Sequence, residues 1–136
     1  MNLDLLTPNG TVIKNGAFTD LVVPTIKGEI NILEGHTHLV TRLSNGIVSM
    51  KNQEGKQRYF SVSHGLCKVL GGKVSILSMT SESAESIDIE RAEKALERAK
   101  KKLSGEEILS DVDLIKQQRK LERAETRLKL AYLRNA

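Results

Sequence analysis

The residues best suited to bind a ligand are basic side chains near the end of this 136-residue sequence. Arg119, Arg123 and Arg127 recur at every fourth position, with Lys116 and Lys120 beside them. Guanidinium groups hold phosphates or carboxylates through paired hydrogen bonds, so this spacing favours a nucleotide or an acidic protein surface as the partner. The competing interpretation is a solvated helix face, partly balanced by acidic neighbours, which would contribute little stability.

Two histidines form the only pattern in the sequence that suggests a metal site. His36 and His38 are two residues apart, so on a strand both side chains would face one side. Zinc sites use three or four protein ligands, and no third one is evident nearby, because His64 stands in a separate Ser-His-Gly turn. We therefore expect surface or turn histidines and no metal site.

No local motif of a serine or cysteine nucleophile is present, and we predict no catalytic residue. Gly71-Gly72-Lys73 is similar to part of a phosphate-binding loop, but that loop needs Ser or Thr at position 74 and Gly at position 67. The chain has Val74 and Cys67 there, so a hairpin turn is the better interpretation. Because Cys67 is the only cysteine, an internal disulfide is excluded, and its alternating neighbours predict a packed core thiol in a reducing cytoplasm.

The composition indicates two modules and no membrane helix. Hydrophobic residues make up 39% of the sequence, and no run approaches the ~20 apolar residues of a membrane span. The N-terminal MNLDLLTPNG lacks the pattern of a signal peptide, so we expect no export. The net charge of +4 mildly favours an acidic partner. Charged residues rise from 15 of the first 86 positions to 23 of the last 50, which predicts a boundary near Ser86.

Residues 1–86 are expected to form a module of β-strands. Short runs of β-branched and aliphatic residues recur between Gly, Asn and Pro turns, which is typical of a sandwich or barrel. The expected strands cover positions 2–7, 11–14, 18–24, 28–33, 46–51, 56–63, 66–70 and 74–79. The expected core residues are Phe60, Val62, Leu66, Val69, Val74, Ile76 and Leu77.

Residues 87–136 are expected to form an antiparallel hairpin of two helices. Apolar residues follow a narrow seam of three- and four-residue steps on each helix. The seam consists of Ile89, Ala92, Leu96, Ala99 and Leu103, then Leu114, Leu121, Ala124, Leu128, Ala131 and Tyr132, with a gap at Gln117 and Gln118. Asp88 is the expected N-cap of the first helix, and Ser110 or Asp111 that of the second.

The hairpin is expected to be marginally stable by itself. Ser104-Gly105 should end the first helix, with the connection over positions 106–109. The seam is thin and rich in alanine, and isolated helices of this length are barely stable in water. We therefore expect the hairpin to need a docking surface or a ligand, and to be mobile without one.

Three motifs occur in a fixed order along the chain. Residues 28–40, GEINILEGHTHLV, form a strand and turn that continue to Leu43-Ser44-Asn45-Gly46. Ile87-Asp88-Ile89-Glu90-Arg91-Ala92 and Arg123-Ala124-Glu125-Thr126-Arg127-Leu128 follow. These motifs and their order, over essentially the whole chain, resemble those of the epsilon subunits of bacterial F-type ATP synthases. One departure is His38, where that family usually has proline.

The resemblance implies an α+β fold, with a β-sandwich of about ten strands followed by the antiparallel helical hairpin. It implies a non-catalytic rotor subunit that couples catalysis to ion translocation at the cytoplasmic face of the bacterial plasma membrane. The sandwich, residues 1–86, would bind the gamma subunit. Its loop would face the ring of c subunits through Leu33, Glu34, Gly35, His36 and His38. The hairpin, residues 87–136, would be regulatory: when extended, it would engage gamma, beta and alpha and inhibit ATP hydrolysis.

The resemblance also implies a regulatory ATP site on the folded hairpin, although no cofactor would be required. The residues implied are Ile87, Asp88, Arg91, Ala92, Arg98, Arg123 and Arg127. Arg91 and Arg98 are seven residues apart and share one helical face, and the last two arginines are four apart on the other helix. Antiparallel pairing would bring both pairs around a triphosphate. The competing interpretation is that Arg91 and Asp88 only cap and brace the first helix.

A nucleic-acid-binding module that uses the basic hairpin is the alternative class of protein. Such a module needs polar and basic side chains aimed at base edges, or aromatic rings for stacking. Tyr132 is the only aromatic residue of the hairpin, and acidic residues are interleaved with the basic ones. We therefore favour the rotor subunit, and filter binding to DNA and RNA across a salt series would distinguish the two classes.

Overall fold

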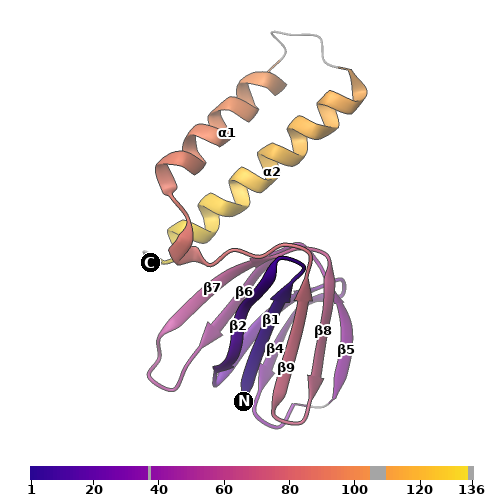
Figure 1. Cartoon of the computed structure of the whole chain (residues 1–136), viewed down its shortest axis with the longest axis vertical. Helices are drawn as coiled ribbons and strands as arrows, with labels where there is room; N and C mark the ends of the chain where they lie inside the picture. The colour runs from indigo at the N-terminus through magenta and orange to yellow at the C-terminus, as the bar shows by residue number, and fades with distance from the viewer. Residues whose placement is uncertain (37, 105–109, 135–136) are drawn as a thin grey trace. The chain divides into compact units, whose positions relative to one another are not determined.

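The computed structural model describes residues 1–36, 38–104 and 110–134. The chain divides into two compact units, Met1–Ala84 and Glu85–Ala136 (Figure 1). The division therefore lies close to the step in charge composition near Ser86.

The first unit is a β-sandwich. In chain order its strands are β1 (Asn2–Thr7), β2 (Gly10–Ala17), β3 (Asp20–Thr25), β4 (Gly28–Leu33), β5 (Leu39–Leu43), β6 (Gly46–Lys51), β7 (Gln57–Val62), β8 (Gly65–Leu70) and β9 (Lys73–Ser78). They pair in the orders β2-β1-β9-β8-β5 and β4-β3-β6-β7, and the two sets join where Thr25 pairs with Leu43. The β1–β9 pair is parallel, whereas the hairpin pairs are antiparallel.

The eight strands expected from the sequence are present with small shifts at their ends, but β5 was not predicted. Apolar and polar residues alternate only weakly along this strand, and Leu43 is its only buried residue. β5 is held instead by five register pairs with β8, from Leu39 opposite Val69 to Leu43 opposite Gly65. Long-range pairing of this kind leaves little trace in the local sequence.

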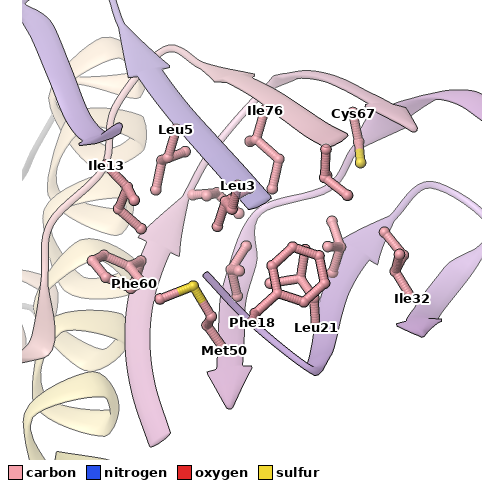
Figure 2. Packing of buried hydrophobic residues seen from close by; sticks show 14 of the residues in the cluster. Leu3, Leu5, Ile13, Phe18, Leu21, Ile32, Met50, Phe60, Cys67 and Ile76 are labelled. Carbon is pink, nitrogen blue, oxygen red and sulfur yellow. The ribbon is translucent and has the colours of Figure 1, made fainter. Parts of the chain in front are cut away.

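The core of the sandwich is aliphatic apart from Phe18, Met50, Phe60 and Cys67 (Figure 2). The prediction that Leu66 and Leu77 belong to the core is wrong, because they are 45% and 49% exposed. These two leucines lie opposite each other in the β8–β9 ladder, so both point to the outer face. The next register pair, Cys67 with Ile76, points inward and is fully buried.

The Cys67 thiol is a core group, as predicted from its neighbours. It is free and fully buried, and burial raises its pKa to about 11. At pH 8 the thiol is therefore protonated as well as covered. We expect Ellman's reagent to react with the native chain at least about 100-fold more slowly than with the chain in denaturant, because reaction requires opening of the sandwich. Equal rates in the two states would contradict this placement.

A buried carboxylate ties the start of β1 to two other strands. Asp4 Oδ1 accepts a hydrogen bond from the Asn15 backbone N–H at 2.8 Å, and Asp4 Oδ2 lies 2.9 Å from Lys73 Nζ. The Asn15 hydrogen bond, followed by the Lys73 interaction, lowers the Asp4 pKa below its ordinary value of 3.8. The stabilisation is therefore present above that value and is lost as the pH falls through the native pKa.

We expect Asp4→Asn to be less stable than the parent chain at neutral pH, and the difference to shrink below pH 3.8. The asparagine keeps an oxygen that can accept from Asn15 but loses the charge that attracts Lys73. Urea unfolding at several pH values measures the difference. A gap that stays constant down to pH 2 would show that the charge of Asp4 contributes nothing.

The segment after β9 pairs with strand β7. The Ser61 N–H donates to the Glu82 carbonyl oxygen at 2.9 Å, and the Glu82 N–H donates to Ser61 Oγ at the same distance. Phe60 and Ser83 form an isolated antiparallel bridge. β7 is an edge strand, so this pairing covers part of an exposed edge. The pairing also extends the sandwich to the end of the first unit.

The second unit contains α1 (Ile89–Leu103) and α2 (Asp111–Arg134), after a short 3-10 helix, η1 (Ala84–Ser86). Tyr132 Oη, near the end of α2, donates to Glu93 Oε1 near the start of α1 at 2.7 Å, so the helices are antiparallel as expected. This hydrogen bond to a carboxylate raises the pKa of Tyr132.

The helix ends follow the expected capping residues. Asp88 is the N-cap of α1, since its Oδ1 accepts from the Arg91 N–H at 3.2 Å. Ser110 rather than Asp111 caps α2, because Ser110 Oγ accepts from the Asp113 N–H at 3.2 Å. Ser104 ends α1 as the C-cap. The expected Gly105 and the connection over 106–109 lie outside the described residues.

The seam between the helices is narrower than the apolar period predicts. On α1 only Ala92 and Ala99 are buried, and the larger seam residues are half-buried. Leu114 and Tyr132 of α2 are 40% and 51% exposed, so the prediction that they belong to the seam is wrong. Leu130, which falls outside the predicted period, is fully buried.

Candidate functional site

A cavity of about 310 Å³ lies between α1 and α2 and is lined by both helices. α1 contributes Ala92, Ala95, Arg98, Ala99 and Lys102. α2 contributes Gln117, Lys120, Arg123, Ala124 and Arg127. Alanines provide the space, because a larger side chain at these positions would fill the gap between the helices.

Four of the seven residues implied for nucleotide binding line this cavity: Ala92, Arg98, Arg123 and Arg127. They come from both helices, as the antiparallel arrangement requires. Ile87, Asp88 and Arg91 are not among the lining residues. Asp88 and Arg91 are instead joined by the N-cap hydrogen bond, so the capping role considered as the competing interpretation is present.

Six lining residues were not included in the predicted site: the alanines Ala95, Ala99 and Ala124, and the polar residues Lys102, Gln117 and Lys120. The sequence does indicate Gln117, because the apolar seam of α2 is interrupted at that position. Its side chain is nevertheless buried, with 8% of the residue exposed. The interruption therefore marks the place where a polar group enters the space between the helices.

The lining of the cavity is cationic. Its ten residues include three arginines, two lysines, four alanines and one glutamine, and none of them is acidic. Five like charges around one small space repel one another, and an anion that enters would remove this repulsion. Guanidinium groups from both helices are suited to hold an anion with several phosphate groups. The cavity therefore presents a cationic surface with no acidic group in its lining.

Arg119 provides a contrast within the same helix. It belongs to the four-residue arginine series noted in the sequence, but it is exposed and does not line the cavity. The regular spacing therefore identified a basic helix. The position of the facing helix α1 determines which of its arginines line the cavity.

The loop implied to face the c-subunit ring follows β4 at one end of the sandwich. Leu33 is 49% exposed, and the His36 N–H donates to its carbonyl oxygen at 3.1 Å. Gly35 has a φ of +82°, which explains the glycine, because other residues rarely adopt that conformation. Glu34 and His38 are exposed.

The β5–β8 ladder places this loop at the same end of the sandwich as the Gly71-Gly72 turn. Leu39, the first residue of β5, lies opposite Val69 at the end of β8. The Gly71-Gly72 turn joins two paired antiparallel strands, so the hairpin interpretation of this segment is confirmed.

Residues 1–36, 38–104 and 110–134 contain neither a candidate metal cluster nor a candidate membrane-spanning helix. No group of three or more His, Cys, Asp or Glu side chains in these ranges could hold a metal ion. In the same ranges, no helix combines the length and the apolar composition that crossing a membrane requires.

Both units match families of known proteins. Residues 1–84 match the family described as ATP synthase, Delta/Epsilon chain, beta-sandwich domain. Residues 85–131 match its companion, the ATP synthase, Delta/Epsilon chain, long alpha-helix domain. The ATP synthase epsilon chains of Staphylococcus aureus strains JH9 and Newman are each 39% identical over 134 residues, which cover 98% of both chains.

Solved structures of rotary assemblies are also similar. A chain in the Euglena gracilis mitochondrial ATP synthase, in a structure of OSCP, F1 and the c-ring, has a TM-score of 0.78 and 28% identity. That alignment covers 98% of this chain and 81% of the other. A chain from the central stalk and c-ring of the Tetrahymena thermophila enzyme shares the fold, with a TM-score of 0.56, 15% identity and coverage of 96% of each chain.

The chain belongs to the ATP synthase delta/epsilon family. It is a non-catalytic subunit of the central stalk, and the fold predicted from the sequence, a sandwich followed by two helices, is confirmed. The alternative of a nucleic-acid-binding module receives no support from these matches.

Proposed function

We propose that this stalk subunit couples catalysis to ion translocation and restrains ATP hydrolysis through its helical hairpin, with ATP as a regulatory ligand of the folded hairpin. The observation that carries the ATP site is the cavity between α1 and α2, which gathers five cationic side chains and no acidic one. A nucleoside triphosphate carries about four negative charges near neutral pH, because each of its three phosphates has lost one strongly acidic proton and the terminal phosphate loses a second with a pKa near 6.

The weak packing of the hairpin explains why a ligand would change its conformation. Two alanines, Ala92 and Ala99, are the buried residues of α1, and helices with so little buried apolar surface are barely stable alone. A ligand that binds only the closed hairpin stabilises that form and shifts the population away from an extended one. ATP would thereby favour the folded, non-inhibitory state.

Calorimetric titration of ATP into the full chain tests the site. We expect saturable binding that weakens at least about tenfold in Arg98→Ala and in Arg127→Ala, since each loses a charge-assisted contact with phosphate. Arg119→Ala is the matched control, because Arg119 lies on the same helix and outside the cavity. An absence of heat at millimolar ATP, or equal losses in all three variants, would exclude the site.

We propose the partners by the same reasoning from the family. The sandwich would bind the gamma subunit, the loop after β4 would contact the c-subunit ring, and the extended hairpin would reach beta and alpha. The chain would then lie at the cytoplasmic face of the bacterial plasma membrane, held there by the complex. The Staphylococcus relatives and the exposed loop support this arrangement.

Leu33 is the best position for testing the contact with the c-subunit ring. Its side chain is exposed, and its backbone has no positive φ, unlike Gly35, where any substitution strains the turn. We expect Leu33→Glu to impair ion-coupled activity of the membrane complex while hydrolysis by the detached head is unchanged. Equal losses in both assays would contradict the contact.

A further inference from the structure

We propose that the hydrogen bond between Tyr132 and Glu93 is a clasp that holds the free end of the helical hairpin closed and controls how readily α2 separates from α1. Tyr132 Oη donates to Glu93 Oε1 at 2.7 Å, across 39 positions of the sequence. Neither residue belongs to the family motifs or to the lining of the cationic cavity. The effect of the clasp on ATP hydrolysis rests on the proposed function of the hairpin, whereas its effect on hairpin opening does not.

The clasp lies at the end of the hairpin where no direct connection joins the two helices. α1 and α2 are linked through residues 104–110, at the opposite end. Glu93 lies near the start of α1 and Tyr132 near the end of α2, and Figure 1 shows these two helix ends side by side. Local opening begins at the ends of helices, so a bond at this place opposes the first step of separation.

An apolar groove between the helices positions the ring of Tyr132. The groove is lined by Leu96, Glu125, Leu128, Lys129, Tyr132 and Leu133. Glu93 and Leu96 are three residues apart on α1, and Leu128 and Tyr132 are four apart on α2, so each pair shares one face of its helix. Tyrosine combines an apolar ring with a polar tip. The ring therefore lies along the groove, and its hydroxyl reaches the carboxylate of the opposite helix.

The hydrogen bond of the clasp has a charged acceptor, which makes it stronger than a bond between neutral groups. The same bond is the main cause of the raised pKa of Tyr132, so the hydroxyl keeps its proton and remains a donor at neutral pH. Both residues are exposed, and water competes for the same groups. We therefore expect loss of the bond to raise the ratio of open to closed hairpin by about fivefold.

The rest of the helix interface is thin, which gives a single hydrogen bond a large share in holding it together. The buried residues of α1 are Ala92 and Ala99, whose small side chains remove little apolar surface from water. Only a small free energy therefore separates the closed hairpin from open forms. A fivefold change in their ratio then alters the fraction of chains in which α2 has left α1.

Hydrogen–deuterium exchange of the full chain measures this opening directly. Leu130 and Ala131 are fully buried next to the clasp, so their backbone N–H groups report on separation of the end of α2. We expect these amides to exchange about fivefold faster in Tyr132→Phe, which keeps the ring, and in Glu93→Ala. The double variant should exchange no faster than either single one, because both substitutions remove the same bond.

Two further substitutions provide the controls. Glu97→Ala removes the same charge from an exposed position one turn further along α1, outside the cavity and the groove. Tyr59→Phe removes a tyrosine hydroxyl from the sandwich. Both variants should exchange at the parent rate. Exchange at the parent rate in Tyr132→Phe, or effects of the two clasp substitutions that add in the double variant, would overturn the clasp.

Hydrolysis by the reconstituted head separates the clasp from the proposed function. At one fixed ATP concentration, Tyr132→Phe should restrain hydrolysis more strongly than the parent chain, because more of the hairpin is open. Restraint by the parent chain, together with parent-like exchange in Tyr132→Phe, overturns the clasp and leaves the function standing. Faster exchange in Tyr132→Phe, with no restraint by the parent chain, supports the clasp and overturns the function. Faster exchange with restraint equal to that of the parent chain would overturn the regulatory effect of the clasp.

Discussion

Replacing Gly65 by alanine is expected to destabilise the sandwich by about 3 kcal/mol or more, a large share of the stability of a small domain. A Cβ atom at this position would lie 1.7 Å from the Leu77 carbonyl oxygen and 2.8 Å from its carbonyl carbon. Both atoms belong to the backbone of β9, which pairs with β8 along its whole length, so neither can move without breaking the ladder. Urea unfolding followed by circular dichroism measures the loss.

Gly72 provides a matched control in the turn between the same two strands. A Cβ atom there meets no other atom within 4 Å, and the residue has no positive φ. We expect Gly72→Ala to change the free energy of unfolding by no more than about 0.5 kcal/mol, as for an unconstrained surface substitution. Equal stability of the two variants would show that the close approach of β8 to the Leu77 backbone is not a constraint.

Removal of the helical hairpin has the second large expected effect. We expect a chain that ends at Ser86 to fold, to bind the gamma subunit and to lose the restraint on ATP hydrolysis. The core cluster lies entirely between Leu3 and Ile76, and the segment that pairs with β7 ends at Ser83, so the truncation leaves the packing of the sandwich intact. The measurements are circular dichroism, co-purification with gamma, and hydrolysis by the reconstituted head.

The full chain in the same preparation is the control for this truncation. An unfolded fragment would contradict the independence of the first unit. A folded fragment that binds gamma and restrains hydrolysis as strongly as the full chain would contradict a regulatory role for the hairpin.

The fold of the sandwich was largely predictable because alternation and turn residues are local signals. β5 escaped prediction because its place depends on pairing with β8, which is distant in the sequence. Leu66 and Leu77 were misplaced for a related reason. Both faces of β8 and β9 carry apolar side chains, and the two-residue period does not tell which face is buried.

The candidate site was only partly predictable. The spacing alone placed the arginines on two helices, and only the family resemblance singled out Arg123 and Arg127 over Arg119. The physical reason for that choice is the orientation of α2 toward α1. The sequence indicated Gln117 only as an interruption of the apolar seam of the second helix. Its burial in the cavity depends on how the two helices face each other, which the spacing within one helix does not fix.

We propose that this stalk subunit restrains ATP hydrolysis through a hairpin that ATP holds folded. The most direct test is the rate of ATP hydrolysis by the gamma-containing catalytic head, measured with and without the full chain over a range of ATP concentrations. We predict that the bound chain slows hydrolysis, most strongly at low ATP, where the hairpin site is empty. Equal rates with and without the chain at every ATP concentration, while the chain remains bound to gamma, would contradict a regulatory role for this subunit.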